Sequence, residues 1–187
     1  MTKSYPYILI FGSIIGLVAS FFLMVDTIEL IRNPAADLPC NISPFISCGS
    51  AILSEQGEVF GFPNPILGLI SFSMLLATGI MLFAGGRAHK LYWQLVNLGS
   101  LASVVFIIWF AYQSLFNLGT LCIYCLITWA VTWPIFLYTT IWNYRENHLG
   151  ENSALHFVSK NHLVFLILFY LILGALIFFK FRDYFVY

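Results

Sequence analysis

Five long apolar stretches, each free of charged residues, dominate the chain. They cover residues 7–25, 66–83, 91–115, 121–142 and 163–179. A helix of about 17–25 such residues is long enough to cross the ~30 Å hydrocarbon core of a bilayer. The first stretch lacks a small-residue cleavage site, so we interpret it as a membrane anchor rather than a signal peptide. The pattern predicts an all-α integral membrane protein with five transmembrane helices.

The composition excludes a soluble domain. Of the 187 residues, 60% are hydrophobic and 9% are charged, and a soluble domain of this size cannot hide so much apolar surface. The formal net charge is zero, so no basic field indicates a nucleic-acid partner. We therefore expect membrane lipid to surround most of the protein.

An odd number of spans fixes which connections share a membrane face. Lys3, the turn 87–90 and the loop 145–160 lie on one face and carry five of the eight Lys and Arg residues. This bias favours a cytoplasmic N-terminus. Residues 32–64 and 116–121 then share the extracytoplasmic side, an oxidising compartment in bacteria and in the endoplasmic reticulum. All four cysteines of the chain lie there or just inside the bilayer, where disulfide chemistry is possible.

The loop 32–64 is punctuated by Pro and Gly and contains one short amphipathic pattern. Residues 44–54 read as a short helix with Pro in its first turn. Its apolar face carries Phe45, Cys48 and Ile52, so we expect it to lie on the bilayer interface. Cys48 should then point toward the helix bundle, while Cys40 stays on the watery side.

The second cysteine pair, Cys122-x-x-Cys125, opens the fourth span. We expect Thr120 to cap this helix, which places Cys122 in the first turn and Cys125 one turn deeper. A helix N-terminus stabilises a thiolate, whereas apolar burial opposes it. Because thiol–disulfide exchange requires contact between sulfurs, the two pairs predict an electron relay in which Cys48 meets Cys122.

The residues around Cys125 fit an electron acceptor that is dissolved in lipid. Trp129 and Trp133 follow at one-turn spacing, and an uncharged aromatic slot suits a flat quinone ring. Asn64, the expected N-cap of the second span before Pro65, and Ser54 are candidate hydrogen-bond donors to the quinone. With no carboxylate or His cluster expected near this face, hydrolysis and metal-assisted chemistry are poorly supported.

Simpler interpretations of the same residues stay open. The inner cysteines can be small packing residues, and the outer pair can be a static structural disulfide. Four thiolates can also bind zinc. Asn64 can serve only as an N-cap, Ser54 can only end the loop helix, and Trp129 can be ordinary bundle packing.

The order of these motifs resembles the vitamin K epoxide reductase family. Cys40-x7-Cys48 is followed by Ser54 six residues later, by a Pro-Asn pair that ends at Asn64, and by Cys-Ile-Tyr-Cys opening a later span. The likeness covers roughly residues 5–145. It implies a four-helix transmembrane bundle around a quinone pocket, with the fifth helix appended.

The resemblance also divides the chain. Residues 1–145 would form the catalytic membrane domain, with the shuttle cysteines in the loop 32–64. Residues 146–187 would form a cytoplasmic loop and the fifth transmembrane helix.

The resemblance further implies a role for each cysteine. Cys40 would take electrons from a thioredoxin-fold partner, Cys48 would relay them to Cys122, and Cys125 would face the quinone. In bacterial members of the family the product is a disulfide in a DsbA-like protein. About eight residues follow Phe179, so we expect the partner to be a separate protein.

Two further residues of this chain match residues of the family's motif, and one position differs from that motif. Asn64 matches the quinone-binding Asn of the family, and Ser54 matches the Ser or Thr below the loop helix. Trp129 stands where animal enzymes have a Tyr, and Trp has no hydroxyl, so the resemblance leaves open whether an epoxide is a substrate. The acceptor would be a membrane quinone of the menaquinone (vitamin K) or ubiquinone type.

Our hypothesis is a membrane thiol:quinone oxidoreductase of the bacterial inner membrane, with its active cysteines on the periplasmic side. One alternative is a DsbB-type protein, in which the Cys-x-x-Cys pair would come in the first external loop rather than last. Another is a non-enzymatic scaffold or transport subunit with a structural disulfide.

Overall fold

The computed structural model describes residues 4–43, 45–150 and 153–185. These residues form the helices α1 (Tyr5–Arg32), α2 (Cys48–Ile52), α3 (Pro65–Phe83), α4 (Lys90–Tyr112), α5 (Ile123–Arg145), α6 (Ser153–Lys160) and α7 (His162–Phe185). A 3-10 helix covers Glu55–Glu58, and a π-helical segment, Gln113–Leu118, continues α4. Five helices of the described part are long and apolar enough to cross a membrane, namely α1, α3, α4, α5 and α7. The predicted all-α membrane fold with five spans is therefore confirmed.

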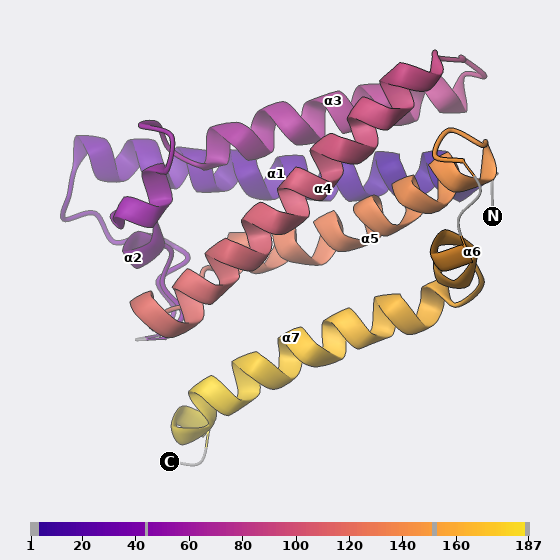
Figure 1. The fold of residues 1–187 in the computed structure, drawn as a ribbon. Helices are drawn as coiled ribbons and strands as arrows, with labels where there is room; N and C mark the ends of the chain where they lie inside the picture. Colours follow the sequence, from indigo (N-terminus) through magenta and orange to yellow (C-terminus); the bar gives the residue numbers. More distant parts are fainter. Residues whose placement is uncertain (1–3, 44, 151–152, 186–187) are drawn as a thin grey trace.

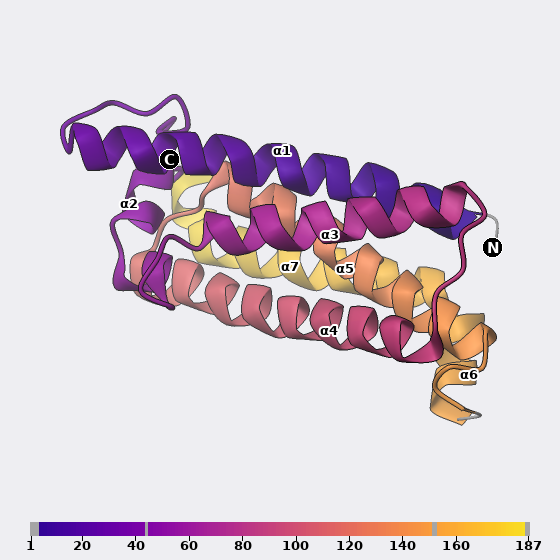
Figure 2. The same ribbon diagram turned by 90° about the horizontal axis from the view of Figure 1, so that it is seen from above.

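Four of these helices form a bundle and the fifth lies beside it. The helix α1 packs against α3 and α5, and α4 packs against α5 on the other side (Figures 1 and 2). The helix α7 contacts the bundle through α5, where Trp133 stacks on Phe169 with ring centroids 4.5 Å apart. The cysteine loop and the start of α5 lie at one end of the bundle, and the N-terminus lies at the other (Figure 1).

Small residues allow α1 to approach its neighbours closely. A Cβ atom at Gly16 would overlap the Phe72 ring of α3, and one at Gly12 would lie 3.1 Å from the Ile135 side chain of α5. Phe72 and Ile135 belong to a buried cluster with Tyr5, which is separate from the buried cluster that contains the cysteines. Gly12 and Gly16, two small residues four positions apart, thus serve helix packing.

The helix α1 is longer than the apolar stretch 7–25 predicted. It continues to Arg32 because Asp26, Thr27 and Leu30 bury one face of its last turns against the bundle. The helix stops there because Pro34 disfavours a helical conformation in the residue before it, and Asn33 has an extended backbone with φ −138° and ψ 94°. The extension carries an acidic side chain toward the cysteines.

The second span begins as predicted, with Asn64 at the N-cap position and Pro65 as the first helical residue. The side chain of Asn64 does not cap the helix. Its Nδ2 donates to the Gln56 carbonyl oxygen (2.6 Å), and its Oδ1 accepts from the Val59 N–H (3.3 Å). Asn64 therefore fixes the end of the loop over the start of α3.

Candidate functional site

The loop helix is shorter than predicted because tertiary pairing replaces its first turns. A helix over 44–54 was expected, but α2 spans Cys48–Ile52 alone, and Pro44 lies outside the described residues. The Ser47 side chain caps α2 by accepting from the Ser50 N–H. Ser54, expected near the helix end, instead caps the following 3-10 helix.

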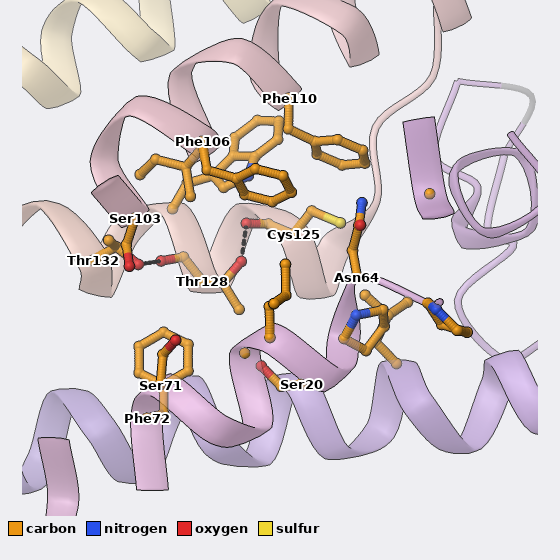
Figure 3. A pocket seen from close by; sticks show the side chains of 18 of the residues that line it. Ser20, Asn64, Ser71, Phe72, Ser103, Phe106, Phe110, Cys125, Thr128 and Thr132 are labelled. Carbon is orange, nitrogen blue, oxygen red and sulfur yellow. Dashed lines mark hydrogen bonds between the residues drawn. The ribbon is translucent and has the colours of Figure 1, made fainter. Parts of the chain in front are cut away.

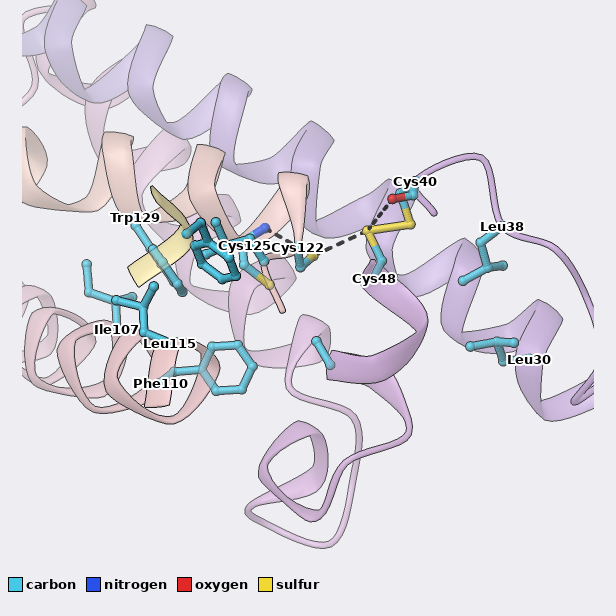
Figure 4. Close-up of a cluster of buried hydrophobic side chains, with 13 residues drawn as sticks. Leu30, Leu38, Cys40, Cys48, Ile107, Phe110, Leu115, Cys122, Cys125 and Trp129 are labelled. Carbon is cyan, nitrogen blue, oxygen red and sulfur yellow. Dashed lines mark hydrogen bonds between the residues drawn. A yellow bond between two sulfur atoms is a disulfide. The ribbon is translucent and has the colours of Figure 1, made fainter. Parts of the chain in front are cut away.

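A short backbone pairing connects the two cysteine segments. The Leu121 N–H donates to the Phe45 carbonyl oxygen (2.8 Å), and the Ser47 N–H donates to the Leu121 carbonyl oxygen (2.9 Å). Cys48 and Cys122 are the next residues along the two paired segments. Their sulfur atoms lie 3.4 Å apart (Figure 4), close enough for one sulfur to attack the other.

The outer pair, Cys40 and Cys48, forms a disulfide with a Cα–Cα distance of 5.7 Å. The expectation that Cys40 stays on the watery side is wrong. Cys40 is only 4% exposed, because Leu30 of α1 and Leu38 of the loop belong to the same buried cluster. A zinc site that uses these two sulfurs would require thiolates, and the bonded pair offers none in this state.

The inner pair, Cys122 and Cys125, consists of two buried free thiols. Cys122 itself, rather than Thr120, is the N-cap of α5, and its sulfur accepts from the Cys125 N–H (3.4 Å). A hydrogen bond from the Cys125 thiol is the main cause that lowers the pKa of Cys122. Burial opposes this shift, while the N–H groups of Cys125 and Tyr124 reinforce it. The arrangement favours a thiolate on the sulfur that faces Cys48.

An acidic side chain that the sequence analysis missed lies beside the outer pair. Asp26 of α1 is 8% exposed, and its Oδ2 lies 3.3 Å from the Cys40 sulfur. This carboxylate lies at the outer pair, and not on the quinone face below Cys125 that the expectation concerned. An acidic residue directly after an uncharged membrane stretch is a functional signal in itself, but the predicted first span ends at residue 25, just before Asp26.

A cavity of about 360 Å³ opens between α1, α3, α4 and α5 next to the inner pair. Cys125, Asn64 and Trp129 all line it, together with the Phe72, Phe106 and Phe110 rings (Figure 3). The lining is mostly apolar with a few hydroxyl groups, which is typical of sites for flat apolar ligands. These residues fit a quinone ring by volume and by chemistry.

The hydroxyl groups of the cavity were not predicted. They belong to Ser20, Thr27, Ser71, Ser100, Ser103, Thr128 and Thr132. Spacings of three and four residues placed several of them on one helical face within otherwise apolar spans, and this spacing was the available signal. Thr128 and Thr132 donate to carbonyl oxygens of their own helix, those of Cys125 and Thr128.

Two predicted quinone contacts lie elsewhere. Ser54 is absent from the cavity lining and borders a separate hollow of about 300 Å³ between α1 and the loop. Its hydroxyl donates to the Ala51 carbonyl oxygen and accepts from the Gly57 N–H. Trp133 points to α7, where it stacks on Phe169. Of the predicted pocket residues, the structure brings Asn64 and Trp129 to Cys125.

Comparison with known proteins agrees with this geometry. Residues 7–140, most of the chain, match the sequence model of the vitamin K epoxide reductase family. No curated protein matches the chain. The matched region contains all four cysteines, the loop between α1 and α3, and all but the outer ends of the four helices that enclose the cavity. The chain therefore belongs to the vitamin K epoxide reductase family, whose members are membrane redox enzymes that act on thiols and quinones.

Proposed function

We propose that the protein is a membrane thiol:quinone oxidoreductase that forms a disulfide in a separate thioredoxin-fold, DsbA-like partner. The observation that carries this proposal is the 3.4 Å separation between the sulfurs of Cys48 and Cys122. This short distance joins a disulfide near the extracytoplasmic end to a thiol pair whose second member, Cys125, lines a quinone-sized cavity. Two electrons can pass from the outer pair to the inner pair without any large movement.

The transfer is a sequence of balanced thiol–disulfide exchanges. A partner thiolate attacks Cys40 and releases Cys48 as a thiolate, and the second partner thiol then releases Cys40 and closes the partner disulfide. Cys48 next attacks Cys122 of an oxidised inner pair and releases Cys125. Finally Cys40 attacks Cys48 and releases Cys122. The product has an outer disulfide and two inner thiols, which is the state in the structure.

The cavity is the proposed quinone site. A bound quinone would accept two electrons and two protons from the reduced inner pair. Asn64 uses one of its two Nδ2 hydrogens on Gln56, which leaves the second for a quinone oxygen. Trp129, 2% exposed and packed against Phe110, forms part of the apolar wall. The quinone would be of the menaquinone or ubiquinone type.

We further propose that the protein lies in a bacterial inner membrane with the cysteine end on the periplasmic side. The distribution of Lys and Arg supports this orientation. Cysteines introduced in the turn after α3 and in the loop after Phe60 should react with a membrane-impermeant maleimide from opposite sides of the membrane. Labelling of both positions from one side would contradict the topology.

The decisive experiment combines full-length protein in lipid nanodiscs, a reduced DsbA-like protein and a quinone. Wild type should oxidise the partner and reduce the quinone in equal amounts. Cys48→Ala, mixed instead with the oxidised partner, should form a covalent adduct: Cys40 attacks the partner disulfide and releases one partner thiolate, and the Cys48 sulfur that would displace the partner is missing. Cys122→Ala should oxidise one equivalent of partner and then stop. Unchanged turnover in Cys122→Ala would favour the scaffold with a structural disulfide.

A further inference from the structure

Asp26 is the buried acid of the cysteine end. Among the acidic residues whose side chains the structure describes, it alone is buried. Glu29, Asp37, Glu55, Glu58 and Glu146 are exposed. Its Oδ2 lies 3.3 Å from the Cys40 sulfur, within hydrogen-bonding range for sulfur. Burial of a carboxyl group costs free energy unless the group is hydrogen-bonded, so packing alone does not account for an acid at this point.

No cation offsets the charge of Asp26 within the part of the chain that the structure describes. Its carboxyl group faces Cys40 and Cys48 from the loop and Cys122 and Tyr124 from α5. Each of these groups is neutral or negative, so an ionised carboxylate would be poorly stabilised. A neutral carboxyl group that donates to the sulfur of the disulfide satisfies the site.

The residue next to Cys40 cannot take the role of an acid or base. Asn41 is an amide, and its Oδ1 already accepts from the Ser47 hydroxyl (3.0 Å) and from the Gly49 N–H (3.3 Å). Asn41 therefore shapes the turn that carries the outer pair. The proton of Cys40 needs another acceptor in an interior without basic groups.

We propose that Asp26 is the acid–base group of Cys40. The inference rests on the proposed relay and adds a proton path to it. When the second partner thiol displaces Cys40, the carboxyl proton passes to the leaving Cys40 sulfur. The outer pair is then reduced, with a Cys40 thiol and an Asp26 carboxylate, and no charged sulfur remains at this position.

The same proton returns when the outer disulfide re-forms. Asp26 accepts the proton of the Cys40 thiol, and Cys40 attacks Cys48 in the mixed disulfide between Cys48 and Cys122. The bond between Cys40 and Cys48 forms, the bond between Cys48 and Cys122 breaks, and Cys122 leaves as a thiolate. Asp26 ends the step as a neutral acid, which fits its buried position beside the disulfide.

The first test uses Asp26→Asn, which keeps the shape of the side chain but cannot transfer a proton. Full-length protein, oxidised at both pairs with diamide, is reduced with dithiothreitol, quenched with acid and alkylated. Mass spectrometry then quantifies the peptide pair joined by Cys48 and Cys122. Resolution of this mixed disulfide should slow on the order of 100-fold at neutral pH, within the range for positioned acid–base groups. The difference in rate between Asp26→Asn and wild type should shrink at high pH, where the Cys40 thiol ionises without a neighbouring base.

Two variants serve as matched controls. Glu29→Gln removes an exposed acid one turn further along α1 and should change the rate by about twofold at most, because solvent screens its charge. Asp26→Glu keeps a carboxyl group and should recover most of the rate. The same mixed-disulfide lifetime and pH dependence in Asp26→Asn as in wild type would overturn the proposal.

The second test uses wild type, so it does not depend on whether a variant at Asp26 folds. Infrared difference spectra of wild type labelled with ¹³C-aspartate compare the oxidised and reduced outer pair. Reduction should remove a labelled carboxylic-acid band and add an S–H band, and an unchanged carboxyl region would refute the proton path. Neither test contains a quinone or a protein partner. Failure of wild type to reduce quinone would therefore overturn the proposed function but would not change the result of either test of Asp26.

Discussion

The two cysteine pairs are built by different kinds of structure. The inner pair lies within four consecutive residues, where one helix start fixes the distance and places the Cys125 N–H on the Cys122 sulfur. The outer pair lies in one loop, but the groups that position it come from three segments that are far apart in the chain. Asp26 of α1 lies beside Cys40, and the backbone of Leu121 pairs with the strand-like residues before Cys48.

In the proposed relay, this difference separates an electron acceptor with a fixed geometry from an electron donor whose position depends on other elements. The inner pair keeps its geometry as long as the first turn of α5 is formed. The outer pair meets the inner pair only while the loop stays paired to Leu121 and α2 stays capped. Substitutions outside the cysteines should therefore act on transfer between the pairs more than on the inner pair itself.

Breaking the pairing at Leu121 should have the largest effect. Leu121→Pro removes the N–H that donates to Phe45, so Cys48 is no longer held against Cys122. Displacement of reacting atoms by about 1 Å costs roughly 100-fold in rate. We expect a loss of this order in the rate at which the reduced outer pair reduces the disulfide between Cys122 and Cys125, measured by quenched alkylation after the outer pair is reduced.

The control for this substitution is Leu121→Ala, which removes the buried side chain and keeps the N–H. Its loss of transfer should be much smaller than that of Leu121→Pro. Equal losses in both variants would mean that side-chain packing, and not the backbone pairing, aligns the two sulfurs.

The quinone side of the inner pair should respond to Asn64→Asp. The substitution keeps the oxygen that accepts from Val59 but removes the amide hydrogens. Loss of one hydrogen bond, about 1.4 kcal/mol, should raise the quinone KM about tenfold. Exchange between the cysteine pairs, measured without quinone, should stay unchanged. Ser54→Ala is the control because Ser54 lies outside the cavity, and a raised KM in that variant alone would reverse the assignment.

Loosening α2 should have a smaller effect. Ser47→Ala removes the side chain that caps this five-residue helix, and a lost N-cap costs about 1 kcal/mol. Transfer from Cys48 to Cys122 should slow about fivefold in stopped-flow measurements, which is the rate equivalent of that free energy. Ser50→Ala, which leaves the Ser50 N–H and the Ser47 side chain in place, should behave as wild type. Similar slowing in both variants would argue against capping as the cause.

The sequence was sufficient for those features that depend on local pattern. Uncharged stretches predicted the five spans, and the parity of the spans put both cysteine segments at one end of the bundle. The Asn64-Pro65 pair marked the start of α3. Each of these predictions needs only the composition of a stretch, the length of a helix or the preference of a residue for a helix end.

The features that were missed all depend on contacts between distant segments. The apolar face of residues 44–54 predicted a helix, but pairing with Leu121 draws Phe45–Ser47 into an extended conformation. The watery position expected for Cys40 overlooked the leucine side chains that cover it. Asp26 was missed because hydropathy alone ended the first span at residue 25, although the buried face of α1 continues to Leu30.

The smallest expected effect concerns the protonation of the inner pair. The hydrogen bond from the Cys125 thiol is the main cause that lowers the pKa of Cys122. Cys125→Ala removes this donor, so the pKa of Cys122 should rise and its thiolate should form only at higher pH. The measurement is the pH profile of methyl methanethiosulfonate labelling at Cys122, which should move to higher pH relative to wild type. Cys125→Ser, which retains a donor in the same position, should shift the profile less. If the profile of Cys125→Ala coincides with that of wild type, the N–H groups at the start of α5 stabilise the thiolate by themselves, and the inner pair depends on the helix end rather than on its second sulfur.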